Sequence, residues 1–331
     1  MKAAVFEKNG LDNLEIKDVP RPSVDSHDVL IRVKMAGVNP IDFFVVSGMR
    51  QINPMPHIPG AEFAGIVEEI GNHVTRIEKG DRVVVYNRVF DDVCDMCLSG
   101  REMLCRNGGI MGVVTNGGYA EYIAVPEKNV FRIPDDMSWE LAASLSVAAL
   151  TSYHALNEAQ LRINECLVVF GASGNTGMFA VQFGSRLGAN VIAVTRKGWL
   201  RDYGAHYVVG YENADEEIRK ITAGKMADVV LNSLGSETWP KALEALGLGA
   251  RLVFFGTLTG AKIDLDLGKI YFKQAKIIGT TGGSRKEMQD LIDTAGKLKL
   301  RLWKKFRLEE AANALKSLSS KERDGRILLE L

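Results

Sequence analysis

The sequence predicts an α/β protein of two domains, one a doubly wound parallel sheet and the other a mostly antiparallel, barrel-like β domain. Three observations carry this prediction. The chain has 331 residues, more than one small hydrophobic core organises. Short β-type segments fill its first part, whereas apolar strands alternate with helical segments in its middle. A glycine-rich turn, LVVFGASGNTG at 167–177, lies at the start of the alternating region.

The first part of the chain is rich in short segments with clustered or alternating Val and Ile. We expect strands at residues 1–6, 28–33, 65–70 and 82–86, with turns such as EKGD at 78–81 between them. Strands this short, separated by glycine and proline, favour a mostly antiparallel, barrel-like domain over a helical one.

The middle of the chain opens with a helical pattern at 138–160, in which small alanines allow close packing. Six strands are then expected, at 167–170, 191–195, 207–209, 229–232, 252–255 and 277–280. Strands that alternate with helices in this way are typical of a doubly wound parallel sheet.

The tail of the chain carries two helical patterns, at 286–297 and 308–318, and a last strand at 326–331. We expect this tail to return to the first domain. The predicted division is therefore 1–125 plus 283–331 for the β domain and 126–282 for the parallel sheet.

Composition excludes several classes of partner. Lys plus Arg equals Asp plus Glu at 41 each, so the formal net charge is zero and no nucleic-acid partner is expected. No apolar run reaches the length of a membrane span, and the N-terminal MKAAVFEKNG does not resemble a signal peptide. We therefore expect a cytoplasmic protein with no membrane partner and with a small molecule as its substrate.

The turn at 167–177 has the pattern of a dinucleotide-binding site. The apolar run ends at Gly171, and Gly174 and Gly177 follow before a helical segment, so backbone N–H groups would face an anionic phosphate. The next strand ends in Thr195, Arg196 and Lys197, where an NAD site would carry an acidic residue. An arginine there can hold a 2′-phosphate, which favours NADPH over NADH. Two alternatives are a strand–helix turn without a ligand and an Arg196 that is simply a solvated surface charge.

Three of the four cysteines form a metal-type cluster. The spacing is Asp91-x2-Cys94-x2-Cys97-x7-Cys105, and three thiolates with one carboxylate satisfy a tetrahedral Zn²⁺ without leaving a position for substrate. We therefore expect one structural zinc ion per subunit, in a lobe at about 88–108. The alternative is three free thiols beside a loop carboxylate. Cys166, at the start of a strand, is expected to be a buried small hydrophobe.

Together these residues and motifs resemble the medium-chain dehydrogenase/reductase superfamily. The resemblance extends over essentially the whole chain and rests, beside the cysteine cluster and the glycine turn, on AGVNPID at 36–42, PGAEFAG at 59–65, GDRV at 80–83, GGYAE at 117–121, LNSLG at 231–235 and GRI at 325–327. It implies a GroES-like domain from the two ends of the chain and a Rossmann domain in the middle. It also implies a homodimer or homotetramer joined through the edge of the Rossmann sheet.

One departure from the family is informative. In the zinc alcohol dehydrogenase branch, three residues bind a catalytic zinc ion, and the matching positions here are Asn39, Ala61 and Val147. An amide is a poor zinc ligand and the two aliphatic side chains are none. Glu62 is retained, and His57 either assists as a further ligand or marks the turn before Pro59. The AGVNPID segment looks like the quinone oxidoreductase and 2-enoyl reductase branch, which works without metal.

That branch implies an active-site floor formed by Asn39 and Asp42, although both side chains could instead brace the turn at Pro40. Without a Lewis acid, a conjugated acceptor is the easier substrate, because its charge delocalises and hydrogen-bond donors suffice. The candidate catalytic residues are Asn39, Asp42, Asn87 and Tyr153. Arg88 either favours an anionic substrate or forms a salt bridge at the rim.

The resemblance also implies a set of cofactor-binding residues at the carboxyl ends of the parallel strands. They are Thr151, Gly171, Ser173, Gly174, Asn175, Thr176, Gly177, Thr195, Arg196, Lys197, Tyr211, Asn232, Ser233, Phe255, Gly256 and Thr257. The functional hypothesis is an NADPH-dependent reductase of quinones or activated double bonds. Its alternatives are an alcohol dehydrogenase with an unconventional metal site and a nucleotide-binding protein without turnover.

Overall fold

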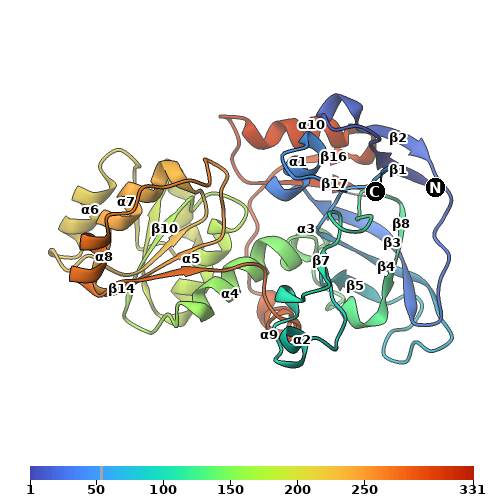
Figure 1. Cartoon of the computed structure of the whole chain (residues 1–331), viewed down its shortest axis with the longest axis horizontal. Helices are drawn as coiled ribbons and strands as arrows, with labels where there is room; N and C mark the ends of the chain where they lie inside the picture. The colour runs from blue at the N-terminus through green and yellow to red at the C-terminus, as the bar shows by residue number, and fades with distance from the viewer. Residues whose placement is uncertain (53–54) are drawn as a thin grey trace. The chain divides into compact units, whose positions relative to one another are not determined.

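The computed structural model describes residues 1–52 and 55–331, which form two compact units (Figure 1). One unit comprises Met1–Ala148 and Ser284–Leu331, and the other comprises Ala149–Gly283. The first unit thus extends beyond the expected position 125. The reason is that β9 (Val130–Arg132) pairs with β5 (Arg82–Val85), which keeps the following segment with the first sheet.

The first unit contains a seven-stranded sheet in the order β16-β17-β3-β4-β5-β9, and β8 pairs with the first residues of β3, Asp28 to Arg32. All of its neighbours are antiparallel except β16 and β17. The remaining strands of the sheet are β3 (Asp28–Gly37), β4 (Phe63–Ile70), β8 (Tyr122–Pro126), β16 (Leu302–Arg307) and β17 (Arg326–Glu330). Two further pairs are β1 (Lys2–Val5) with β2 (Glu15–Asp18) and β6 (Arg88–Val89) with β7 (Gly109–Ile110).

Short helices surround this sheet. They are η1 (Leu11–Asn13), α1 (Pro40–Ser47), α2 (Asp95–Leu98), η2 (Glu102–Leu104), η3 (Glu127–Asn129), α3 (Trp139–Ala142), α9 (Arg285–Ala295), η7 (Leu308–Glu310), α10 (Ala311–Lys316) and η8 (Ser317–Ser319). The tail of the chain joins the first unit through β17, in which Leu328 pairs with Gly37 of β3. The strand β16 was not expected from the sequence, and the helical pattern at 308–318 is split into η7, α10 and η8.

The helix expected at 138–160 is also interrupted. The structure has α3, a π-helical turn η4 (Leu145–Ala149) and α4 (Leu150–Glu158) in its place. Two backbone N–H groups of this turn, those of Val147 and Ala148, donate to the Glu62 carboxylate at 2.7 and 2.9 Å. A side chain that takes backbone donors out of the helical ladder is a known cause of such a bulge.

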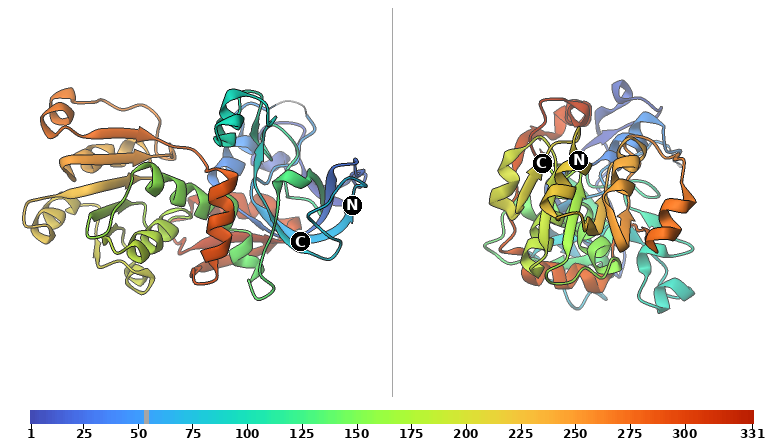
Figure 2. Two further views of the ribbon diagram at one scale, coloured as in Figure 1. Left: turned by 90° about the horizontal axis from the view of Figure 1, so that it is seen from below. Right: turned by 90° about the vertical axis from the view of Figure 1, so that its left-hand side faces the viewer.

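The second unit is a six-stranded parallel sheet, as predicted, with helices beside it (Figure 2). Its strand order is β12-β11-β10-β13-β14-β15. Its strands are β10 (Cys166–Phe170), β11 (Asn190–Val194), β12 (Tyr207–Val209), β13 (Ala227–Asn232), β14 (Leu246–Phe254) and β15 (Lys276–Gly279). Its other helices are α5 (Gly177–Leu187), η5 (Gly198–Tyr203), α6 (Ala214–Ile221), η6 (Ser236–Thr238), α7 (Trp239–Glu244) and α8 (Leu267–Lys273).

Helices cover both faces of this sheet, and the side chains of its strands alternate between the two faces. A Cβ added to Gly184 of α5 would meet Leu167 and Val191, so these side chains face α5. Their neighbours Val168 and Ile192 belong to a core cluster that includes Ile218 of α6 and Ala242 of α7. Residues one apart therefore point to opposite faces, as in any strand that is buried on both sides.

No helix in the part of the chain that the structure describes has the length and apolar character needed to cross a bilayer.

Candidate functional site

The glycine turn of the second unit has the geometry of a phosphate-binding loop. Gly171, directly after β10, has φ +74°, a conformation that glycine adopts without strain. A Cβ at Gly177 would overlap the carbonyl oxygen of Gly171, so this position requires close packing of helix α5 on the strand. At Gly174 an added Cβ would meet only the Gly171 oxygen, at 3.1 Å, among the residues described. The backbone there is open to an incoming ligand, as a pyrophosphate would need.

Polar side chains from the neighbouring strand end meet this turn. The Thr195 hydroxyl donates to Ser173 Oγ at 3.0 Å and accepts from the Lys197 N–H at 3.2 Å. Tyr211 lies near the Gly171 backbone and the Arg196 guanidinium, and burial raises the pKa of Tyr211. Arg196 itself is exposed. Four predicted cofactor residues are thus brought together beside the glycine turn.

Further predicted cofactor residues, among them Asn232, Ser233 and Gly256, lie at or just after the carboxyl ends of β13 and β14. Asn232 Oδ1 accepts hydrogen bonds from the Leu234 and Gly235 N–H groups, so this buried amide braces its own loop. Ser233 Oγ donates to the Phe170 carbonyl at 3.2 Å. The segment after β14 packs against it, since a Cβ at Gly256 would overlap the Ser233 carbonyl oxygen.

In the helices of this unit, the Ser152 hydroxyl donates to the Thr176 carbonyl at 2.7 Å, which ties α4 to the end of the glycine turn. Thr151 lies on α4, and Asn175 is buried in the turn. Tyr153, a candidate catalytic residue, also lies on α4, and its ring packs edge-on against Phe183 of α5, with centroids 5.4 Å apart.

The first unit contains a buried ion pair between Arg326 and Glu62, the acidic residue that the sequence retains beside the expected zinc-ligand positions. Glu62 and Arg326 are both completely inaccessible to solvent, and one Glu62 oxygen, Oε2, accepts from the Arg326 guanidinium. The same oxygen accepts from Asn39 Nδ2 at 2.9 Å. Its other oxygen accepts from the two amides of η4 described above. Both carboxylate oxygens are therefore occupied by donors of the chain.

The Arg326 guanidinium is satisfied on several sides. It donates to Asn39 Oδ1 at 2.8 Å, to the Val38 carbonyl at 3.1 Å and to Ser144 Oγ at 3.2 Å. In the sequence, Arg326 stands out only as part of a terminal GRI motif. No local pattern marks an arginine as buried, because its partners come from β4 and from residues near α1 and α3, far away in the sequence.

Asn39 and Asp42 form the capping box of α1. The Asn39 N–H donates to Asp42 Oδ2 at 2.9 Å, and Asp42 Oδ1 accepts from the Ala61 N–H at 2.9 Å. The Tyr119 hydroxyl also donates to Asp42, at 3.2 Å. Burial raises the pKa of Asp42 to about 6, although these three donors act in the opposite direction. Both side chains are buried and positioned as braces, the alternative that the sequence left open at Pro40.

These residues do not fit a catalytic metal ion. The three expected ligand positions hold the Asn39 amide and the aliphatic Ala61 and Val147, and the Glu62 oxygens are already taken by hydrogen-bond donors. His57 is buried, with Nε2 3.1 Å from the Gly112 carbonyl oxygen, so it is held in a loop. The donor set lacks the thiolate and imidazole nitrogens that zinc prefers.

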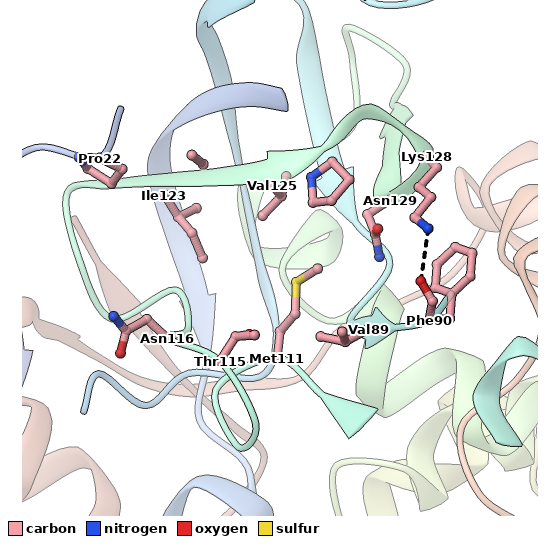
Figure 3. A pocket seen from close by; sticks show the side chains of 12 residues that line it. Pro22, Val89, Phe90, Met111, Thr115, Asn116, Ile123, Val125, Lys128 and Asn129 are labelled. Carbon is pink, nitrogen blue, oxygen red and sulfur yellow. Dashed lines mark hydrogen bonds between the residues drawn. The ribbon is translucent and has the colours of Figure 1, made fainter. Parts of the chain in front are cut away.

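Two further predicted positions lie on or just before β6. Asn87 is buried, and its carbonyl oxygen accepts from the Met111 N–H at 2.9 Å. Arg88 is also buried, and burial lowers its pKa. A pocket of about 320 Å³ opens between β8 and the loop that follows β7 (Figure 3). Apolar side chains line it, among them Val89, Met111 and Val125. No predicted site residue lines this pocket.

The cysteine cluster does fit a structural zinc ion. Cys94 Sγ lies 3.5 Å from Cys97 Sγ and 3.8 Å from Cys105 Sγ, and all four ligand atoms, with one from Asp91, lie within 4.8 Å of one another. Tetrahedral zinc with bonds of about 2.3 Å separates its sulfur ligands by about 3.8 Å. No other group of three such residues occurs in the described part of the chain.

The chain orients the carboxylate of this cluster. Asp91 Oδ1 accepts from the Cys94 and Val93 N–H groups at 3.0 Å, and Asn107 Nδ2 donates to Oδ2 at 2.7 Å. These hydrogen bonds, of which the one from Cys94 has the largest effect, hold the pKa of Asp91 well below its usual range. The carboxylate is therefore charged, as a metal ligand must be. Next to it, Lys128 binds Asp92 at 2.6 Å and anchors the lobe.

Comparisons with known proteins agree with this arrangement. The family described as "Alcohol dehydrogenase GroES-like domain" matches residues 25–135, and that described as "Zinc-binding dehydrogenase" matches 176–297. An alcohol dehydrogenase of Geobacillus stearothermophilus is 31% identical, with all of both chains covered. An acryloyl-coenzyme A reductase of Sulfurisphaera tokodaii is 28% identical over 96% of each chain. The solved structure of a thermostable alcohol dehydrogenase from Pyrobaculum aerophilum is similar with a TM-score of 0.93, at 41% identity, over 100% of this chain and 99% of that one.

Replacing Arg326 by leucine tests the buried ion pair. The change leaves the Glu62 carboxylate buried without its cation, so we expect the free energy of unfolding to fall by about 3–5 kcal/mol. The measurement is urea denaturation followed by circular dichroism. Lys305→Ala is a matched control, because the pair of Lys305 with Glu140, at 3.2 Å, is partly exposed and its loss should cost about 1 kcal/mol or less. Equal losses in the two variants would contradict the assignment.

The raised pKa of Asp42 predicts a pH-dependent stability. The carboxyl has a pKa of about 6 in the folded protein against an ordinary value of 3.8, so the folded state binds more protons between these values. The contribution of Asp42 to the free energy of unfolding is complete below pH 3.8 and is lost as the pH rises through about 6. The total loss is about 3 kcal/mol.

Asp42→Asn removes the titration as well as part of the cap. We expect the wild type to lose stability relative to this variant from about pH 4 to pH 7. Denaturation midpoints and m-values measured across that range give the difference. Parallel stability curves for the two proteins would show that Asp42 does not titrate as described.

Proposed function

The chain belongs to the medium-chain dehydrogenase/reductase superfamily, and on that basis we propose that it is an NADPH-dependent oxidoreductase that transfers a hydride to a conjugated acceptor. The acceptor class is a quinone, an enone or enal, or an enoyl thioester, and no catalytic metal takes part. The observation that carries this proposal is the state of Glu62, whose two oxygens are held by Arg326, Asn39 and two backbone amides. A structural zinc ion would occupy the cysteine cluster.

The choice of a conjugated acceptor follows from the charge of the Glu62–Arg326 pair. A guanidinium paired with a carboxylate is neutral as a unit, so it does not polarise an isolated carbonyl as Zn²⁺ does. In a conjugated acceptor the developing negative charge spreads over several atoms, and ordinary hydrogen-bond donors stabilise it. The nicotinamide supplies the hydride when the cofactor is bound. The chain positions the cofactor through the glycine turn and braces the first unit through Asn39 and Asp42.

The preference for NADPH is supported by the end of β11. Arg196 and Lys197 follow Thr195 where a carboxylate would select NADH, and Arg196 is exposed beside Tyr211. A guanidinium can form charge-assisted hydrogen bonds with a 2′-phosphate.

The main alternative is an alcohol dehydrogenase with an unconventional metal site. It is favoured by the names of several relatives, including the one from Pyrobaculum aerophilum. The acryloyl-coenzyme A reductase of Sulfurisphaera tokodaii, by contrast, carries the name of a reductase of a conjugated thioester. A protein that binds the nucleotide but has no turnover is the second alternative.

We also propose a homodimer or homotetramer joined through the Rossmann sheet. The strand β15 is at the edge of that sheet, and the adjacent helix α8 exposes Leu267, Tyr271 and Phe272. An edge strand with apolar neighbours is suited to pairing with its own copy about a two-fold axis. A cytoplasmic location is consistent with four free cysteines.

Zinc content and substrate range test the proposed reaction together. We expect one zinc atom per subunit by elemental analysis, together with NADPH oxidation in the presence of quinones, enals or enones. Two zinc atoms per subunit with oxidation of simple alcohols would support the alcohol dehydrogenase instead. Binding of NADPH, measured by its fluorescence, without turnover on any acceptor would support the non-catalytic protein.

Cofactor choice is tested by Arg196→Ala. Loss of the charge should weaken NADPH at least about tenfold, since charge-assisted bonds to a phosphate contribute about 1.5–3 kcal/mol, and should leave NADH nearly unchanged. Dissociation constants for both cofactors come from fluorescence titration. Arg219→Ala, on the exposed side of α6, is the matched control and should alter neither constant. Equal weakening of both cofactors by Arg196→Ala would refute the assignment.

A further inference from the structure

Two histidines from separate loops of the first unit lie against each other on its surface. His27 directly precedes β3, and His73 follows β4. Their rings are 4.9 Å apart between centroids, and His73 Nδ1 lies 3.4 Å from His27 Nε2. Both residues are exposed, so nothing in the described structure covers the pair. Neither histidine belongs to the motifs discussed above.

The backbone fixes this arrangement. The His73 N–H donates to the Ser26 carbonyl at 2.8 Å, and the Glu127 N–H donates to the His27 carbonyl at 3.0 Å. The Gly71 N–H donates to the Asp28 carbonyl at 2.8 Å. A Cβ at Gly71 would overlap the Asp25 carbonyl oxygen, so the two loops are in close contact there. Main-chain hydrogen bonds therefore hold together the two loops that carry the imidazoles.

The separation of the two ring nitrogens matches a metal-chelating pair. Zinc–imidazole bonds are about 2.0–2.1 Å long, and a tetrahedral angle between two of them places the nitrogens about 3.4 Å apart. As a hydrogen bond between the rings, a distance of 3.4 Å is long, because N–H hydrogen bonds usually span about 2.9–3.0 Å. The spacing thus suits an ion between the nitrogens better than a shared proton.

We propose that His27 and His73 form a second metal site, which binds one divalent transition-metal ion of the Zn²⁺, Ni²⁺ or Cu²⁺ class through two imidazole nitrogens. Water completes the coordination, because the site is open to solvent. The site is distinct from the Cys94, Cys97 and Cys105 cluster, which is built of thiolates. Imidazole ligands without thiolates favour Cu²⁺ and Ni²⁺ over Co²⁺.

The surroundings of the site are acidic. Asp25 lies two residues before His27 in the sequence, and Asp28 directly follows it. Carboxylates close to the imidazoles raise the local concentration of cations. An ion bound here would join the loop before β3 to the loop after β4 and would stabilise the folded first unit by mass action.

Nickel titration of the zinc-loaded protein tests the proposal. We expect isothermal titration calorimetry to detect one Ni²⁺ per subunit in addition to the zinc of the cysteine cluster, and Ni²⁺ to raise the thermal unfolding midpoint. Because chelation requires both rings, either His27→Ala or His73→Ala should weaken Ni²⁺ at least about tenfold and abolish the shift of the midpoint. Ser26→Ala is the matched loop control, since it retains both imidazoles and the backbone carbonyl that binds His73.

Two outcomes would overturn the site. One is the absence of any additional Ni²⁺ binding to the wild-type protein at millimolar metal. The other is Ni²⁺ binding that is unchanged in both histidine variants, which would place the ion elsewhere. Circular dichroism of each variant shows whether it is folded, and because both side chains are exposed we expect unaltered spectra. Neither outcome bears on the proposed reductase, whose test uses zinc content and NADPH oxidation.

Discussion

A salt bridge without access to water, between Glu62 and Arg326, connects the distant parts of the first unit. Removing two charges from water costs several kcal/mol per ion unless each has its full set of partners. Here the carboxylate has four donors and the guanidinium reaches Asn39, Val38 and Ser144. These partners come from the starts of β4, α1 and β17 and from the segment around η4. Each of these elements is thereby fixed to the others.

The ion pair also explains local features that seem unrelated. The π-helical turn η4 exists where Val147 and Ala148 direct their N–H groups to Glu62. The ion pair also explains why residue 37, in the AGV segment, is a glycine. A Cβ at Gly37 would overlap the Arg326 guanidinium and would approach Glu62 Oε2 to 2.5 Å. A sequence motif and a helix irregularity are therefore two consequences of one contact.

Sequence reasoning succeeded where the signal is local. Short apolar runs between helical segments predicted the six parallel strands, because a strand covered on both faces is apolar at successive residues such as Leu167 and Val168. Close spacing predicted the metal lobe, because Asp91, Cys94, Cys97 and Cys105 lie within one loop region and need little else to meet. Sequence reasoning failed where a segment depends on contacts with distant residues. It predicted a continuous helix at 138–160 and did not predict β16 or the role of Arg326.

The same distinction applies to the candidate catalytic residues. Asn39 and Asp42 were selected by residue type and position, and the structure shows that their polar atoms are occupied by Glu62, Arg326, Ala61 and Tyr119. In the proposed reaction these two residues would therefore keep the start of α1 rigid, since a buried amide with its bonds satisfied is a weak donor to a substrate. A site built in this way has a fixed shape and no strong electrophile. Such a site would suit the conjugated acceptor that we propose, because that acceptor disperses its own charge. On this proposal, the substrate class follows from Asn39, Asp42, Glu62 and Arg326, whose contacts also stabilise the fold.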